Sequence, residues 1–312
     1  MFRQVLCIEK VVRLIFSECI SKEQEIYQFL LTCVNPLSPI QAQAFMDYGF
    51  EPDSMFSFVH EGKLCALLQT YRRTLMFLNQ KTSVVFIARG FYKKGFKSRL
   101  DALIEAAVEA AGKTSLFILA ETREPSLYRR LGFGKVSTRL ESELIEVFSG
   151  ADETNAVHLW DGLSDLYPLY RQFMSFFDGS VILSEAEFDN LLEEQTDAGS
   201  KIYCSLENGE TAAFAITSAH PEGISLDTLI YADPGALLNL LAYFDSLYDV
   251  VHLHYSKAEN LDALADLEIF PHSSLMMKVC DLGAFNRWQN AHAESFEDVF
   301  ALLQRPQWNF LY

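Results

Sequence analysis

The chain has 312 residues, half of them apolar, and carries a formal net charge of −17. This length is enough for two domains with ordinary hydrophobic cores. The negative charge argues against a nucleic-acid partner, because binding phosphates requires a basic surface. It fits a cationic substrate attracted by the field of the protein, and it fits equally well a charge that serves only solubility.

The sequence has no run of about 18 uncharged apolar residues, so no membrane span is expected. The N-terminus carries Glu9 and Glu18 and lacks a small-residue cleavage site, which argues against a signal peptide. The six cysteines are scattered, without a C-x-x-C pair or a Cys/His cluster at metal spacing. We therefore expect a cytoplasmic protein with reduced cysteines, no bound metal and no membrane partner.

Two helices are predicted within residues 3–34. The first rests on apolar residues at helical spacing, which are Val5, Ile8, Val11, Val12 and Ile15. Ser21 can cap the second, which runs to about Phe29. Further on, Met55 to His60 and Leu64 to Thr70 flank Glu61-Gly62-Lys63 and predict a β-hairpin.

A strand, a helix and a second strand are predicted between residues 83 and 120. Ser83 to Ala88 and Ser115 to Ala120 are short apolar runs typical of buried strands. Between them, apolar residues recur every three or four positions and predict one face of a helix that ends at Gly112. These residues are Leu100, Leu103, Ile104, Ala107, Val108 and Ala111.

A basic loop joins the first strand to this helix. Its residues are Tyr92, Lys93, Lys94, Gly95, Phe96 and Lys97, with Arg99 close behind. A glycine at a helix entrance lets backbone N–H groups approach an anion, and the helix dipole and the lysines favour negative charge there. The loop therefore suggests a phosphate site, although a solvated basic surface would have the same composition.

The order of these elements, followed by Leu127-Tyr128-Arg129-Arg130-Leu131-Gly132-Phe133-Gly134, resembles the acetyl-CoA core of the GNAT N-acetyltransferases. The next stretch, residues 134–144, resembles the branch named for enhanced intracellular survival (Eis), whose members carry two GNAT-like domains in tandem. The resemblance covers residues 80–150 best. It implies an α/β (α+β) fold of two tandem GNAT-like domains, each a mixed, mostly antiparallel sheet flanked by helices, with acetyl-CoA as the cosubstrate.

The second half of the chain repeats the first in the same order, which suggests an internal duplication. A hairpin around Asn208-Gly209 is followed by a strand, a helix and a strand at residues 225–232, 236–247 and 250–256. Here Asp233-Pro234-Gly235 leads directly into the helix, and Asp233 would repel a phosphate. The second copy is therefore not expected to bind CoA. Residues 136–147 and 274–280 are predicted to be the last strand of each half.

These features divide the chain into an N-terminal GNAT domain at 1–149, a degenerate GNAT-like domain at 150–284 and a tail at 285–312. An aromatic stripe at helical spacing is interpreted as a packed interface rather than a ligand platform; it comprises Tyr167, Tyr170, Phe173, Phe176 and Phe177. Residues 281–285 match the join to a sterol-carrier-like third domain in the family, which is expected to be missing or reduced to a tail here.

The resemblance also implies site residues. The backbone near Val85 and Ile87 would pair with the pantetheine arm of CoA, and the amides of Tyr92, Lys93, Lys94, Gly95, Phe96 and Lys97 would hold the pyrophosphate. Tyr92 stands where the family has Arg or Gln, and Lys97 where it has a small residue. Tyr128 falls on the tyrosine that protonates the departing thiolate; the alternative is a core tyrosine.

The general base remains open in the sequence. Eis-branch members use a C-terminal carboxylate delivered by the third domain. Here the alternatives are Glu121, at the end of the second strand, and the carboxylate of Tyr312, if the aromatic tail folds back. Glu121 could also be a solvated strand-end carboxylate, and the tail could pack on a groove or a dimer contact.

The predicted function is acetyl-CoA-dependent N-acetyl transfer to a primary amine, by direct attack in a ternary complex. The acceptor class is a small amine or a lysine-type amine, and the family pattern is compatible with a homo-oligomer. The alternative is a catalytically degenerate tandem GNAT that acts as a binding or scaffold protein.

Overall fold

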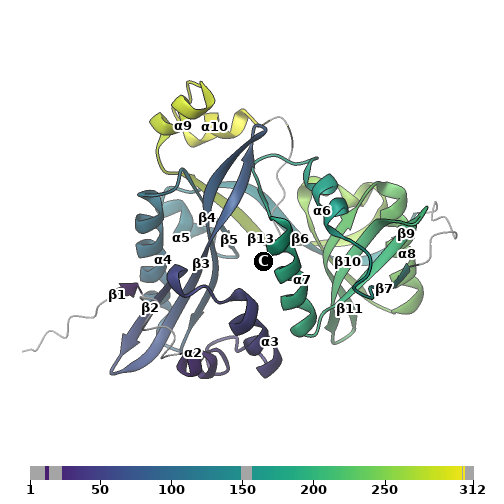
Figure 1. The fold of residues 1–312 in the computed structure, drawn as a ribbon, viewed down its shortest axis with the longest axis horizontal. Coiled ribbons are helices and arrows are strands. Elements are labelled where there is room, and N and C mark those ends of the chain that lie inside the picture. Colours follow the sequence, from purple (N-terminus) through teal and green to yellow (C-terminus); the bar gives the residue numbers. More distant parts are fainter. Residues whose placement is uncertain (1–10, 14–22, 149–156, 304, 306–312) are drawn as a thin grey trace, which may run out of the picture.

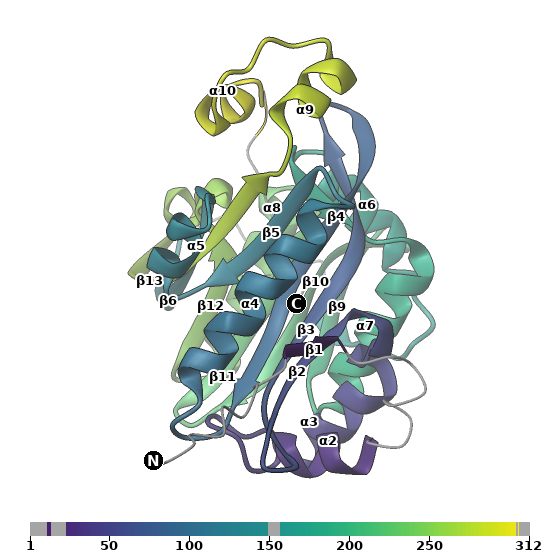
Figure 2. The same ribbon diagram turned by 90° about the vertical axis from the view of Figure 1, so that its left-hand side faces the viewer.

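The computed structural model describes residues 11–13, 23–148, 157–303 and 305. Within these ranges thirteen strands form a single sheet, in the order β1-β2-β3-β4-β5-β13-β6-β12-β11-β10-β9-β7, with β8 paired to β3. Helices lie on both sides of this sheet (Figures 1 and 2). No helix in the described part of the chain has both the length and the apolar content needed to cross a membrane.

The first half supplies strands β1 Val11–Arg13, β2 Met55–His60, β3 Lys63–Phe77, β4 Gln80–Tyr92, β5 Phe117–Thr122 and β6 Gly134–Val147. Its helices are α2 Glu23–Leu30, α3 Pro39–Ala44, α4 Lys97–Gly112 and α5 Pro125–Arg130, with a short π-helix η1 Phe45–Gly49 and a 3₁₀ helix η2 Pro52–Ser54.

The second half supplies strands β7 Val157–Leu159, β8 Ser180–Ile182, β9 Lys201–Glu207, β10 Glu210–His220, β11 Gly223–Tyr231, β12 Val251–Ser256 and β13 Ala265–Val279. Its helices are α6 Tyr167–Met174, α7 Glu185–Asp197, α8 Pro234–Leu247, α9 Leu282–Gln289 and α10 Phe296–Ala301, with short 3₁₀ helices η3 Lys257–Glu259 and η4 Leu261–Ala263.

Local sequence signals account for most of these elements. All six apolar positions predicted for one face of α4 are buried. The hairpin turns at Glu61-Gly62 and Asn208-Gly209 have positive φ at both central residues, as the tight turns that suit the strand twist require. The hairpin predictions and the helix now seen as α2 are therefore confirmed.

The helix predicted from the apolar residues between Val5 and Ile15 is wrong where the structure describes it. Residues 11–13 form strand β1, which pairs antiparallel with the edge of β2. Two consecutive valines suit an extended strand, and pairing with an available edge outweighs a helical apolar spacing. The remainder of this stretch lies outside the described residues, as do residues 149–156, where the domain boundary is predicted.

The last strands of the two halves are exchanged. Residues 136–147 form strand β6, as predicted, but β13 of the second half lies between β5 and β6 and pairs antiparallel with both. β6 in turn pairs with β12 of the second half. The alternation of apolar and polar residues predicts which face a side chain takes but not which strand lies next to it, so the pattern could not show this exchange.

Three apolar clusters fix the layers. One packs α4 on β2 to β5, and a second packs α8 on β6 and β10 to β12. The third lies on the opposite face, which we call the inner face, and joins α6, α7 and α9 to strands of both halves. Figure 1 shows α7 between the β3–β4 part of the sheet and the β10–β11 part. The two halves therefore share one core.

The aromatic stripe of α6 largely serves this shared core. Tyr170, Phe173 and Phe177 are buried, and the Tyr170 ring stacks on Phe188 of α7 with centroids 4.8 Å apart. Phe176 is the exception, with 55% of its surface exposed. The interpretation as a packing interface is confirmed for the three buried rings.

Candidate functional site

The parallel strands β4 and β5 stop pairing before either strand ends. Their last paired residues are Ile87 and Ala120, whereas β4 continues to Tyr92 and β5 to Thr122. The carboxyl ends of two neighbouring parallel strands are therefore left without a shared ladder. Such ends are a common place for ligands in α/β proteins.

A β-bulge in β4 lies at this point. On the β3 side, Gln69 pairs with Arg89 and the next residue, Thr70, pairs with Ile87. Ala88 is thus an extra residue in β4, and an extra residue bends its strand and disrupts the ladder locally. The bulge explains in physical terms why β4 turns away from β5.

A cavity of about 300 Å³ opens beside the bulge. It is lined by Phe86, Ala88 and Arg89 of β4, Glu121, Thr122 and Arg123 at the end of β5, Arg139 of β6, and His272 and Ser273 of β13. Phe86 belongs to the cluster on the inner face, so the cavity opens on the side opposite α4.

The helix that follows β4 begins without a cap. Gly95 has φ +91°, and a Cβ added there would meet nothing within 4 Å. At Phe96, the N-cap of α4, no side chain accepts a hydrogen bond from the first turn. The equivalent helix α8 is capped by Asp233, whose carboxylate accepts the Ala236 N–H at 3.0 Å. Of these two helices, only α4 leaves its N-terminus accessible to an anion.

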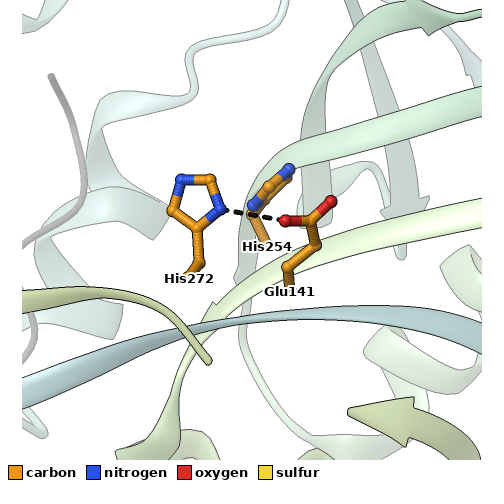
Figure 3. Close-up of side chains that lie close together, drawn as sticks. All are labelled: Glu141, His254 and His272. Atoms are coloured by element: carbon orange, nitrogen blue, oxygen red, sulfur yellow. Dashed lines mark hydrogen bonds and ion pairs between the residues drawn. The ribbon is translucent and has the colours of Figure 1, made fainter. Parts of the chain in front are cut away.

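Polar residues continue from the cavity along the inner face of the central strands. Leu253 and Tyr255 of β12 pack beneath α8, so the alternating residue His254 lies on the inner face. It meets Glu141 of β6 and His272 of β13, and we call these three residues the junction triad (Figure 3). His272 Nδ1 lies 3.0 Å from Glu141 Oε2, and the two imidazole centroids are 5.0 Å apart.

The charges around the junction triad shift its protonation. The hydrogen bond from His272 lowers the pKa of the Glu141 carboxyl, so this group is anionic at neutral pH. Burial lowers the pKa of His254, and the nearby charge of Arg139 lowers it further. The triad therefore combines one carboxylate with a neutral His254 imidazole.

Arg139 and Ser273 hold Glu121 at the cavity. The Ser273 hydroxyl donates a hydrogen bond to Glu121 Oε1, and Arg139 Nη1 lies 3.7 Å from the same oxygen. Nη2 of Arg139 donates to the Asp227 carbonyl at 3.0 Å. The Glu121 side chain is 17% exposed, so it faces the cavity as a positioned carboxylate and not as a solvated strand end.

No protein-family model and no curated protein sequence matches the chain. Solved structures do. A GCN5-related N-acetyltransferase from Anabaena variabilis superposes with a TM-score of 0.68 at 14% identity, over 88% of this chain and 73% of the other. Eis1 from Mycobacterium abscessus gives 0.60 at 14%, over 89% and 74%. A tandem GNAT protein from the clavulanic acid biosynthesis pathway gives 0.51 at 11%, over 87% and 98%.

The chain has the tandem GNAT fold. In this fold the predicted pantetheine-pairing residues, Val85 and Ile87, lie in the last paired part of β4, and their side chains are buried against α4. The predicted pyrophosphate loop is already partly bonded within the protein. The Lys93 N–H donates to Cys65 O and the Phe96 N–H donates to Lys93 O, both at 2.9 Å. The approach for an anion is thus centred on Gly95 and the start of α4.

The basic side chains of the loop are also partly engaged. Lys97 Nζ lies 3.1 Å from Asp101 and 2.9 Å from Glu124. Burial alone would lower the pKa of Lys97, but these hydrogen bonds raise it on balance. Lys93 donates to Thr32 on the other side of the loop, while Lys94 is exposed. Of the three lysines in the predicted pyrophosphate loop, Lys94 is the one whose side chain is exposed.

Tyr128 does not share the inner-face cavity with Glu121. Its side chain is 5% exposed, belongs to the cluster beneath α4, and packs edge to face on Phe133 with centroids 5.3 Å apart. Burial, with a smaller effect of the Asp101 and Glu124 charges, raises the pKa of its phenol well above the ordinary value. The hydroxyl therefore stays protonated. Tyr312, the second proposed source of a base, lies outside the described residues.

The junction triad was not predicted from the sequence. Its members are far apart in the chain, and only the strand exchange brings them together. The available signal was the alternation of charged and histidine residues in two central strands. A strand that served only to support the sheet would carry fewer charged side chains. Those residues are Arg139, Glu141 and Glu143 in β6 and His252 and His254 in β12.

Proposed function

We propose that this protein transfers an acetyl group from acetyl-CoA to a cationic primary amine. One observation carries the proposal: the cavity opens where bulged β4 leaves β5, next to a crossover helix whose N-terminus is uncapped. An uncapped N-terminus after a positive-φ glycine suits a pyrophosphate, and a gap between parallel strands suits an extended arm that uses their open ladder edges.

Acetyl-CoA would bind to the first half of the chain. Its pyrophosphate would lie at Gly95 and the start of α4, with Lys94 nearby, and its pantetheine arm would extend β4 past Ile87. The thioester would then face the inner-face cavity near Ala88. The second half cannot offer the same site, because the Asp233 carboxylate caps α8 and would repel a phosphate.

The acceptor would enter from the inner face. Glu121, Glu141 and Asp227 line or neighbour the cavity, and Glu141 and Asp227 are only partly buried. With a chain charge of −17, these carboxylates would attract an ammonium group. A small polyamine or a lysine-type side chain has the required charge and reach.

The transfer assigns roles to two predicted residues. Glu121 removes a proton from the ammonium, and the neutral nitrogen attacks the thioester carbon while the C–S bond breaks. We place the sulfur in the gap between β4 and β5, where Tyr128, held protonated by burial on the α4 side of the sheet, donates a proton to the departing thiolate. The new amide releases a second proton, which restores the Tyr128 phenol, and the proton on Glu121 passes to solvent.

Glu121→Gln tests this assignment. We expect kcat/KM for 1,4-diaminobutane to fall about 100-fold or more, because a positioned base typically contributes that much. Thiol release from acetyl-CoA measures the rate. Glu109→Gln, an exposed carboxylate on α4 paired with Lys113, is the matched control and should leave the rate unchanged. Tyr128→Phe keeps the ring packing and should lower kcat alone.

Equal rates for Glu121→Gln and the control would remove Glu121 as the base. Absence of thiol release by the unaltered protein across small amines and lysine peptides would instead favour a second function, that of a binding or scaffold protein. The engaged Lys93 and Phe96 amides and the Lys97 ion pairs are the observations that favour this second function.

A further inference from the structure

The junction triad brings three metal-ligating side chains to one point. Glu141 comes from β6, His254 from β12 and His272 from β13, so each ligand sits on a different strand of the sheet. One ligand atom from each residue lies within 4.8 Å of the other two. In Figure 3 both rings and the carboxylate converge on a common region. Ligand atoms bound to one ion at about 2.1 Å lie at most about 4.2 Å apart, so small side-chain movements would suffice.

His254 supplies an independent observation. Its Nδ1 is buried and has no hydrogen-bond partner. A buried polar nitrogen left unpaired costs free energy, and such an atom calls for a ligand. The other ring nitrogen, Nε2, lies 4.0 Å from Asp227 Oδ1, and that carboxylate is fixed by the Ser225 hydroxyl at 2.6 Å. A carboxylate that accepts a hydrogen bond from the far ring nitrogen commonly orients a metal-binding imidazole, and Asp227 would have to close this 4.0 Å gap to do so.

The neighbouring cations leave the ligand atoms accessible. Arg123 Nη2 lies 2.9 Å from His272 Nε2 and 3.3 Å from Nδ1. A group nearly equidistant from both ring nitrogens lies over the ring face and not at its edge, so the edge that carries Nδ1 remains turned to Glu141. Arg139 Nη1 lies 3.7 Å from Glu121 Oε1, and Arg139 Nη2 donates to the Asp227 carbonyl at 3.0 Å.

We propose that the junction triad binds one divalent transition-metal ion of the Zn²⁺ and Co²⁺ type. Two imidazoles and one carboxylate favour such borderline ions over Mg²⁺ and Ca²⁺, which prefer oxygen ligands. Three protein ligands leave at least one coordination position for water or substrate. His272 also lines the 300 Å³ cavity, so the ion would lie at the edge of the proposed acceptor site. The inference does not depend on acetyl transfer.

Because its ligands come from strands of both halves, the ion would also join the two halves. We therefore expect metal to raise the thermal midpoint by about 5 °C at a concentration 100 times Kd. This readout does not require activity. Side chains that bind the ion equally well in the unfolded chain would give no such rise.

The test is calorimetric titration of the full chain, freed of metal by chelator dialysis, with ZnCl₂, together with visible absorption after CoCl₂ addition. We expect one site with a Kd at or below about 10 μM and the d–d absorption of a protein-bound Co²⁺ ion. His254→Gln should weaken binding at least about 10-fold, and Asp227→Asn about 10-fold through the orientation of His254. Glu141→Gln tests the third ligand without touching a histidine.

His252 provides the matched control. It lies two residues from His254 on the same strand. Its ring belongs to a separate cluster of possible ligands, together with His220 and Glu222. His252→Gln should leave Kd and the absorption unchanged. The proposal is overturned if the unaltered chain takes up no Zn²⁺ at about 1 mM, a concentration far above the Kd of metal sites built by protein side chains. It is equally overturned if binding survives in the His254→Gln/His272→Gln double variant, or is lost in His252→Gln.

Discussion

Phe285→Ala should lower the free energy of unfolding by about 3–5 kcal/mol, the usual cost of deleting a fully buried phenyl ring. Phe285 lies within α9, the first of the two C-terminal helices, and is 0% exposed. Its ring lies 5.6 Å from the Phe77 ring, 6.0 Å from Phe117 and 6.3 Å from Trp288, measured between centroids. Guanidinium unfolding followed by circular dichroism measures the change.

Phe176→Ala is the control for this experiment. Phe176 is a phenylalanine of the same size with 55% of its surface exposed, so its removal should change stability by less than about 0.5 kcal/mol. Equal small effects of the two variants would show that α9 does not belong to the shared core. The residues from 285 onward would then be the loose tail that the sequence suggested.

Gly223→Ala should cost about 2–3 kcal/mol, although it adds one methyl group. Gly223 begins β11, and a Cβ there would lie 1.9 Å from the backbone oxygen of Val250. That oxygen accepts the Ile224 N–H at 3.1 Å, so it cannot move away without breaking the start of the β11–β12 pairing. Thermal unfolding is the simplest measurement.

Gly112→Ala offers a matched comparison at the end of α4. The nearest atom to its added Cβ would be the Cys280 sulfur at 3.9 Å, an ordinary contact. Alanine favours helix over glycine, so this variant should be neutral or more stable by up to about 1 kcal/mol. If Gly223→Ala were equally harmless, the backbone of Gly223 would not lie as close to the Val250 oxygen as the structure shows.

The sequence predicted elements whose signals are local. The apolar positions of α4 specified its buried face, and Glu61-Gly62 and Asn208-Gly209 specified two hairpins, because helix periodicity and turn chemistry depend on neighbouring residues. The contrast between Gly95 and Asp233 at the two crossover helices also followed from single residues, and the structure shows the Asp233 cap directly.

Features that depend on distant pairing could not be predicted. Residues 136–147 alternate as a strand should, yet alternation cannot tell β5 from β13 as a neighbour. Once β13 enters the first half, His272 and Ser273 reach Glu121 and Glu141, more than 100 positions earlier in the chain. Glu121 could be named from the end of its strand. The residues that hold it could not.

The packing of residues 285–303 shows the same limit. The sequence offered a tail because the resemblance to a known family ended at Phe285. In the structure α9 and α10 cover the aromatic cluster at the end of the β3–β4 hairpin, with Phe285 and Val299 buried (Figures 1 and 2). The apolar residues that do this are short runs within a polar segment, and their burial depends on a surface built by the first half.

Calorimetric titration with acetyl-CoA tests the central claim most directly, with Gly95→Asp and Gly209→Asp as paired variants. Both glycines have positive φ and open space around an added Cβ, so the two variants carry the same backbone strain and charge. We predict one site in the unaltered protein, an affinity loss of about 100-fold or more in Gly95→Asp through charge repulsion at the start of α4, and no change in Gly209→Asp. No binding to the unaltered protein at about 1 mM, a very weak affinity for any ligand, would contradict the account, as would equal affinities in the two variants.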